Sequence, residues 1–205
     1  MLKKISTTAI GILLIYGAAS ISIKAAIGVT PVDATMATLT AISGLKMGGL
    51  SILFQSIFFL GQIALERKNF RKAELLQIVY ILLGGYLFNF FIYTVLSNVV
   101  FHTYLTRLIS CILAYVFCSL GCILVIDSKL MRIPVEGFAQ VLADRKGLTL
   151  GRVKQILDFL LILLCVALTL IFRVDWTLRE GTIIAAMIFG PLMDMWRKII
   201  KVLSK

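Results

Sequence analysis

A chain of 205 residues with 60% hydrophobic and only 15% charged residues has more apolar surface than a soluble domain of this length can bury. Its mean hydropathy of +1.01 therefore predicts an integral membrane protein, with the lipid bilayer as its surroundings. The net charge of +11 would also suit a nucleic-acid-binding protein. However, Lys and Arg lie in the short connections between apolar runs and form no continuous basic face, so no nucleic-acid partner is expected.

Six apolar stretches approach the length of about 20 residues that a membrane-crossing helix needs. They cover residues 7–27, 48–65, 75–98, 106–126, 151–172 and 181–197. The sequence therefore predicts an all-α integral membrane protein with six transmembrane helices, folded as a single membrane domain over residues 1–205.

The distribution of basic residues orients these spans. With the N-terminus in the cytoplasm, most of the 21 Lys and Arg residues lie on the cytoplasmic side, and both termini are cytoplasmic. The first span follows Lys3 and Lys4 and passes small residues at 18–20, so a cleaved signal peptide is an alternative interpretation. The apolar run continues to Ile27, however, and this favours a retained span.

Short segments opened by proline follow the first and fourth spans. Thr30 is suited to cap a helix, Pro31 to occupy its first position, and Asp33 to act as the acidic member of a capping box. Residues 31–43 give only about three helical turns, too few to cross a bilayer. Two interpretations stay open: a re-entrant half-helix whose N-terminal end faces a substrate pathway, or an amphipathic helix at the membrane interface.

Three landmarks of the first half of the chain return in the second half at one displacement of 103 residues, the difference between positions 31 and 134. They are Pro31-Val32-Asp33 with Pro134-Val135-Glu136, Gly44-Leu45 with Gly147-Leu148, and Gly48 with Gly151. A shared displacement predicts two copies of one unit, at about 7–98 and 106–197. Each unit has three spans, an odd number, so the two form an inverted-topology repeat.

Polar side chains inside the spans give the candidate pathway, because each costs free energy unless it faces a cavity or a partner. Gln55 corresponds to Asp158 at the same displacement, and Asn89 to Asp194 at a displacement of 105. Such residues suit a site for a cation or for a proton coupled to transport. The candidate pathway residues are Asp158, Asp194, Gln55, Asn89, Asp33, Glu136, Pro31 and Pro134.

A structural interpretation of the same residues is also open. Gln55 and Asn89 would then hydrogen-bond between helices. Asp158 and Asp194 would only pair with Arg152, Lys154 or Arg197 near the lipid headgroups.

Motifs for catalysis are missing from the sequence. There is no phosphate-binding loop, no zinc-protease motif and no serine-hydrolase motif. Cys111, Cys118 and Cys122 share one face of the fourth span but lie far from the lone His102, which favours structural thiols over a metal site. We therefore expect a protein that is not an enzyme and has no cofactor and no metal. Glycine pairs such as Gly84-Gly85 indicate close helix contacts, within the fold or across a homodimer.

The glycine and proline pattern of the chain resembles the YitT/YczE group of bacterial inner-membrane proteins over about residues 7–197. The segments that carry it are Gly28-Val29-Thr30-Pro31-Val32-Asp33, Gly44-Leu45-Lys46-Met47-Gly48 and Gly190-Pro191-Leu192-Met193-Asp194. Val32 and Val135 stand where that group commonly has an aromatic residue. The resemblance implies a multi-pass protein of the bacterial cytoplasmic (inner) membrane and assigns no biochemical role.

These patterns favour a small secondary transporter or channel-like permease for a small solute or ion, with its pathway between the two repeats. Transport would proceed by rocking of one repeat against the other. The alternative is a membrane-embedded binding or accessory subunit that acts with a partner protein. Neither the substrate nor a coupling ion follows from the sequence.

Overall fold

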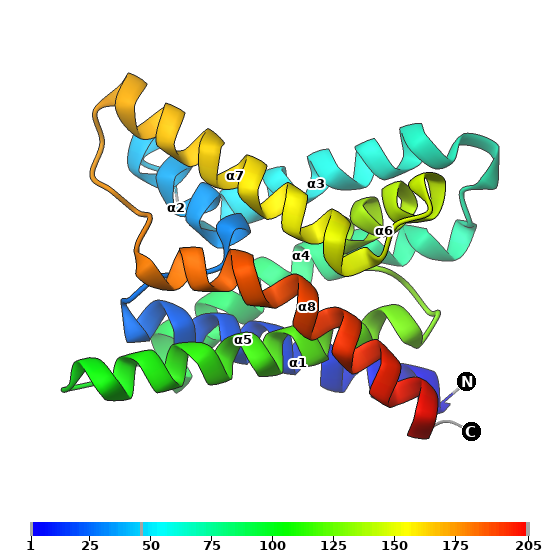
Figure 1. The fold of residues 1–205 in the computed structure, drawn as a ribbon, viewed down its shortest axis with the longest axis horizontal. Coiled ribbons are helices and arrows are strands. Elements are labelled where there is room, and N and C mark those ends of the chain that lie inside the picture. Colours follow the sequence, from blue (N-terminus) through cyan, green and yellow to red (C-terminus); the bar gives the residue numbers. More distant parts are fainter. Residues whose placement is uncertain (1, 46, 204–205) are drawn as a thin grey trace.

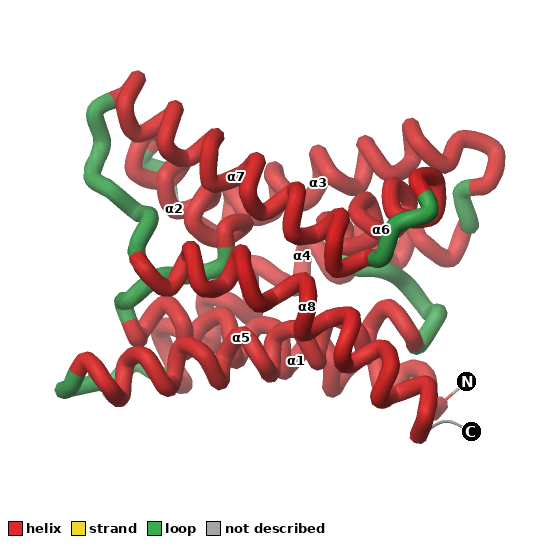
Figure 2. The backbone as a smooth tube through the Cα atoms, in the orientation of Figure 1, coloured by secondary structure: helices red, strands yellow, loops and turns green. Residues whose placement is uncertain are grey.

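The computed structural model describes residues 2–45 and 47–203, which form helices and the loops between them (Figures 1 and 2). The long and short α-helices are α1 (Leu2–Ala25), α2 (Pro31–Ser43), α3 (Met47–Glu66), α4 (Leu76–Phe90), α5 (Tyr104–Asp127), α6 (Pro134–Lys146), α7 (Leu150–Phe172) and α8 (Glu180–Leu203). Two 3₁₀ turns, η1 (Arg67–Asn69) and η2 (Lys72–Leu75), join α3 to α4, which continues as a π-helical segment, η3 (Phe91–Val95).

Five helical segments in the described residues are long and apolar enough to cross a membrane, which supports the predicted membrane protein. They are Lys4–Ala25, Met47–Asn69, Lys72–Val95, Tyr104–Asp127 and Leu150–Phe172. The sixth predicted span, 181–197, forms α8 but is not among these five. Its apolar stretch is bounded by Glu180 and Arg197 and contains Asp194, so α8 is less apolar than the other long helices.

The α-helices form two layers (Figure 1). In one layer, α2 and α6 each pack against both α3 and α7. In the other, α5 lies between α1 and α8, and α4 packs against α1 from this layer and α3 from the first. The halves of the chain therefore interlock: the short helix of each half contacts the long helix of the other.

The contact between α1 and α5 is antiparallel and close. The Thr8 hydroxyl donates to Ser128 Oγ over 2.9 Å at one end, and the Tyr115 hydroxyl donates to the Gly28 carbonyl oxygen over 3.1 Å at the other. Between them the helices approach at Gly11 and Gly121, where a Cβ on either residue would lie within 2.8 Å of the other's carbonyl oxygen. Small residues permit such packing in membrane proteins.

The predicted short helix at 31–43 is confirmed, with the expected start. The Asp33 backbone N–H donates to Thr30 Oγ1 over 3.3 Å, and Pro31 takes the first helical position. Gly44 ends the helix in the left-handed region at φ 69°, as Gly147 ends α6 at φ 66°. Both helices have 13 residues and begin at a proline.

In α2 and α6, burial decreases from the N-terminal end of the helix to its C-terminal end, and does not separate a buried face from an exposed one. Their N-terminal turns, at Pro31–Thr35 and Pro134–Gly137, are largely buried, whereas the chain around Ser43 and Lys146 is exposed. Figure 1 shows the two helices extending from the middle of the molecule toward opposite ends. An interfacial amphipathic helix would instead expose one face along its whole length, so this pattern favours the half-helix interpretation.

Glycines also close the hairpins α3–α4 and α7–α8. A Cβ on Gly48 would lie 3.5 Å from the Gly85 carbonyl oxygen, and a Cβ on Gly151 would collide with the Gly190 carbonyl oxygen. The second hairpin is the tighter of the two.

Replacing Gly151 by Ala should therefore destabilise the protein by about 1–3 kcal/mol, the usual cost of overpacking. Gly49→Ala is the matched control, because a Cβ at Gly49 meets no atom within 4 Å. Thermal melting of the detergent-purified variants checks this. Equal melting temperatures for the two variants would contradict the close contact of α7 with α8.

Candidate functional site

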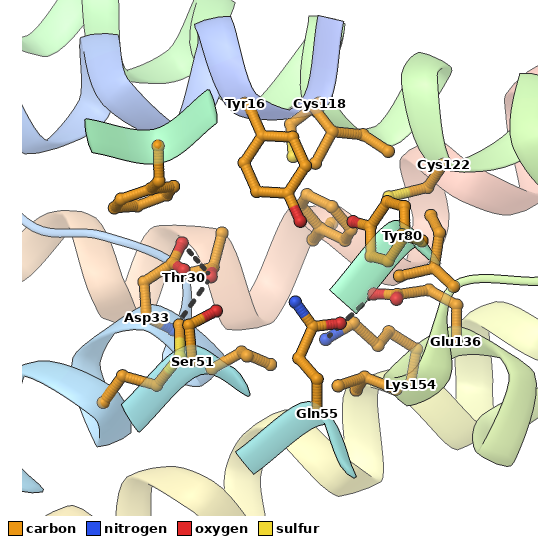
Figure 3. A pocket seen from close by; sticks show the side chains of 17 residues that line it. Tyr16, Thr30, Asp33, Ser51, Gln55, Tyr80, Cys118, Cys122, Glu136 and Lys154 are labelled. Carbon is orange, nitrogen blue, oxygen red and sulfur yellow. Dashed lines mark hydrogen bonds and ion pairs between the residues drawn. The ribbon is translucent and has the colours of Figure 1, made fainter. Parts of the chain in front are cut away.

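A cavity of about 70 Å³ lies between the two layers (Figure 3). Each of the eight α-helices in the described chain contributes at least one lining side chain. Representatives in chain order are Tyr16, Asp33, Gln55, Tyr80, Cys118, Glu136, Lys154 and Phe189. Polar and charged groups from the whole fold thus meet in one small space inside an apolar interior.

The two proline-started helices direct their N-terminal ends and a carboxylate each to this cavity. Asp33 and Glu136 are the third residues of α2 and α6, and both are buried. The Asp33 carboxylate accepts a hydrogen bond of 2.7 Å from the Thr30 hydroxyl. Ile133 stands at the corresponding position before α6 and offers no hydroxyl, so Glu136 faces the cavity without such a bond.

Lys154 is the positive charge of the site. Its ammonium lies 2.6 Å from Asp158 Oδ1, one turn further along α7, and 3.9 Å from Glu136 Oε1. The Lys154 and Asp158 side chains are only 2% and 1% exposed. The ammonium also lies 5.5 Å from the centre of the Phe189 ring, within the range of a cation–π contact. A charge buried this deeply is retained only with close partners of opposite charge.

Several polar atoms at the cavity lack hydrogen-bond partners. The Gln55 side-chain oxygen is buried and unpaired, and Asp158 Oδ2, which lies behind Lys154 and does not line the cavity, is unpaired as well. The Tyr16 hydroxyl lies near Gln55 and Tyr80 without a hydrogen bond of normal geometry to either. Buried polar groups are normally satisfied, so a group of unsatisfied ones beside a cavity indicates space for a bound species.

A second buried polar cluster, at the turn between α3 and α4, has its charges paired, although the Gln77 side-chain oxygen has no hydrogen-bond partner among the described residues. Glu74 is fully buried, forms a salt bridge with Arg71, and accepts from the Arg132 backbone N–H and from Gln77. Arg132 also donates to Glu66 over 2.7 Å. These charges are paired with one another, so the cluster holds the turn to the start of α6.

Three of the predicted pathway residues, Gln55, Asp33 and Glu136, line the cavity, and Pro31 and Pro134 begin the helices that carry the last two. Asp158 stands behind Lys154, to which it is bonded. The fold therefore brings Asp33 and Glu136, which are more than 100 positions apart in the sequence, to the same cavity.

Asp194 and Asn89 are not among the residues lining the cavity. The half-buried Asp194 accepts from the Gly151 backbone N–H over 3.0 Å and from the Thr149 hydroxyl over 2.7 Å, at the start of α7. Asn89 is exposed and lies beside Gly48, at the start of α3. Among the described interactions, none joins Asp194 to Asp158; each carboxylate has its own partner.

Sequence reasoning missed the cavity roles of Lys154, Tyr16 and Tyr80. The sequence-based interpretation of Lys154 is only that of a partner for an aspartate near the headgroups. The available signal was its position four residues before Asp158 on an apolar helix, the spacing of an i,i+4 ion pair. No group of three His, Cys, Asp or Glu residues suited to a metal ion occurs in the part of the chain that the structure describes.

Comparison with known proteins places the chain in a family. The family of unknown function DUF6198 matches residues 2–198. This chain belongs to the DUF6198 family. It is similar to the uncharacterized protein YyaS of Bacillus subtilis (strain 168), with 22% identity over 192 residues, which cover 94% of this chain and 91% of the relative. No solved structure matches. Neither match assigns an activity or names the YitT/YczE group.

Removing the Lys154 charge should be strongly destabilising. Lys154→Met leaves Asp158 and Glu136 without their cation, and breaking a buried ion pair costs about 3–5 kcal/mol. Arg152→Met, on the exposed side of the same helix, is the matched control and should melt like the parent. The double variant Lys154→Met/Asp158→Leu should recover part of the loss, because one of the uncompensated charges is gone. A double variant no more stable than the single one would contradict this pairing.

Proposed function

We propose that this DUF6198 protein is a small secondary transporter or channel-like permease, whose pathway passes through the central cavity between two inverted-topology repeats. The observation that carries the proposal is the meeting of two short helices, α2 and α6, with buried N-terminal ends at a cavity lined by charged side chains. Short helices that end inside the protein, with their dipoles directed at a central site, are typical of transporters built from inverted repeats.

Several matched contacts support the two repeats, 7–98 and 106–197. The helices α2 and α6 have equal length, the same first residue and the same left-handed glycine after them. Gly48 meets Gly85 where Gly151 meets Gly190, and the corresponding helices α1 and α5 run antiparallel. If one repeat is inverted relative to the other, corresponding helices of the two repeats must run in opposite directions.

In the membrane, α8 would supply the sixth crossing, with its charged C-terminal end among the headgroups. Both termini would then be cytoplasmic, in agreement with the distribution of Lys and Arg. The resemblance to the YitT/YczE group supports a bacterial inner membrane as the location. Partners would be the bilayer and a small solute or ion, with a homodimer as a further assembly.

The packing constrains the mechanism. Because α2 packs on α7, and α6 on α3, rocking of one repeat against the other would have to change both of these contacts. The α3–α4 and α7–α8 contacts join the two layers in turn, so a shift of one layer over the other would have to change those contacts. The loops 26–30, 128–133 and 173–179 connect the layers and would act as hinges.

Filling the cavity should block transport. Ser51 lines the cavity from α3, and Ser51→Leu places an apolar side chain in the space that a substrate would occupy. Ser56→Leu is the matched control on the same helix, because Ser56 does not line the cavity. In proteoliposomes tested with alkali cations, small amines and organic anions, the parent and Ser56→Leu should transport one of these solutes, and Ser51→Leu should lose at least about nine-tenths of the flux.

Absence of flux for every solute with the parent protein would overturn the transport proposal. In that case, stable co-purification with a partner protein that restores flux would favour the accessory-subunit alternative.

The inverted topology has its own test. Ser43 and Lys146 are corresponding exposed residues at the C-terminal ends of α2 and α6. Single cysteines there should react with a membrane-impermeant thiol reagent from opposite sides, Ser43→Cys from outside and Lys146→Cys from the cytoplasm. The parent is the control, because its four cysteines are buried and should stay unlabelled. Labelling of both variants from the same side would exclude inverted repeats.

A further inference from the structure

The charges around the cavity do not balance. Lys154 is the only ammonium among the described residues that line the site, and its closest partner is Asp158, at 2.6 Å compared with 3.9 Å for Glu136. Asp33 has no cationic side chain within ion-pair distance among the described residues. Three buried carboxylates thus share one ammonium.

The two helix ends reduce this excess without cancelling it. A helix N-terminus carries about half of an elementary positive charge. Together the ends of α2 and α6 contribute about one positive charge, and the Lys154 ammonium contributes another. Against three carboxylates, about one negative charge is left in a buried space. An isolated buried charge is too costly to persist, so the cavity requires one further positive charge, which either a proton or a bound cation supplies.

An independent observation indicates that a ligand supplies this charge. The Gln55 side chain is only 8% exposed, and its oxygen has no hydrogen-bond partner in the described chain. Figure 3 shows the Gln55 amide in the cavity between Asp33 and Glu136, with the Tyr16 hydroxyl directed toward it. Carboxylate, amide and hydroxyl oxygens are ligands for hard cations. An oxygen held unsatisfied among them is what a cation site requires.

The size and walls of the cavity limit what this cation can be. About 70 Å³ has room for a few water molecules, which suits a dehydrated alkali ion or a small ammonium. The aromatic rings of Tyr16, Tyr80 and Phe189 also favour a weakly hydrated cation. A divalent ion would overcompensate a single negative charge.

We propose that the cavity binds one small monovalent cation between Asp33 and Glu136, with Gln55 as a neutral oxygen ligand. That this cation is the transported or coupling ion rests on the proposed function, whereas its binding does not. The ligands of this site come from both halves of the chain, Asp33 and Gln55 from the first half and Glu136 from the second.

Thermal melting of the detergent-purified full chain tests binding. We expect saturable stabilisation by NaCl, KCl or methylammonium chloride, compared with N-methylglucamine chloride at the same ionic strength, since a ligand of the folded state raises its melting temperature. The bulky N-methylglucamine ion cannot enter the cavity.

Asp33→Asn and Glu136→Gln should each weaken that binding about tenfold or more, because a buried charge partner is lost. Asp175→Asn, in an exposed loop, is the matched control and should bind like the parent. Gln55→Glu adds a negative charge at the oxygen ligand and should tighten binding, which keeps the test decisive if the two charge-removal variants fail to fold.

Equal melting temperatures of the parent in all four salts would overturn the cation site and would indicate that a proton neutralises the cavity. Unchanged affinity in Asp33→Asn and Glu136→Gln would overturn it as well. Cation binding without flux in proteoliposomes would refute transport and leave the site intact. Flux of a neutral or anionic solute, without cation binding, would do the reverse.

Discussion

Two helix ends are buried at the centre of this protein, and the rest of the structure follows from that constraint. The first turns of α2 and α6 have backbone N–H groups without helical partners, and a membrane interior offers no water to satisfy them. Thr30 satisfies one such group in α2, and the carboxylates of Asp33 and Glu136 stabilise the positive helix ends. Acidic residues at these two positions are therefore a consequence of the architecture.

Those carboxylates in turn account for Lys154. An ammonium at 2% exposure in an apolar interior requires several negative partners, and Asp158 and Glu136 provide them from two different helices. The cluster of Glu66, Arg71, Glu74 and Arg132 shows how the same chain balances two carboxylates with two guanidinium groups at the α3–α4 turn. The contrast between a paired cluster and an unbalanced cavity distinguishes a structural polar network from a candidate binding site.

Local signals predicted much of this fold. Thr30, Pro31 and Gly44 mark the ends of α2 by capping chemistry that depends only on neighbouring residues, and the long apolar runs predicted the remaining helices to within a few residues at most ends. Asp33 and Glu136, which the displacement of 103 residues relates, are both third residues of 13-residue helices that begin at a proline. Asp194 and Asn89 are related by a displacement of 105, but the side chain of Asp194 turns to the start of α7, a direction that depends on how closely Gly151 and Gly190 approach.

The spacing of Lys154 and Asp158 indicated an ion pair, but the inward direction of the Lys154 side chain could not be predicted from the sequence. A lysine near the end of an apolar helix usually extends its ammonium to the headgroups. Whether it turns inward depends on Glu136, which comes from another helix and reaches α7 only in the folded chain. The layered packing, the cavity and its charge balance are tertiary properties of this kind.

The interlocked halves have a consequence for how the protein is made. The short helix α2 enters the nascent chain well before α7, the helix on which Thr35 contacts Cys165. Until α7 is synthesised, the buried first turn of α2 and its Asp33 carboxylate have no completed surroundings in the membrane. Synthesis therefore passes through a stage in which α2 has been made but the helix that later covers its first turn has not.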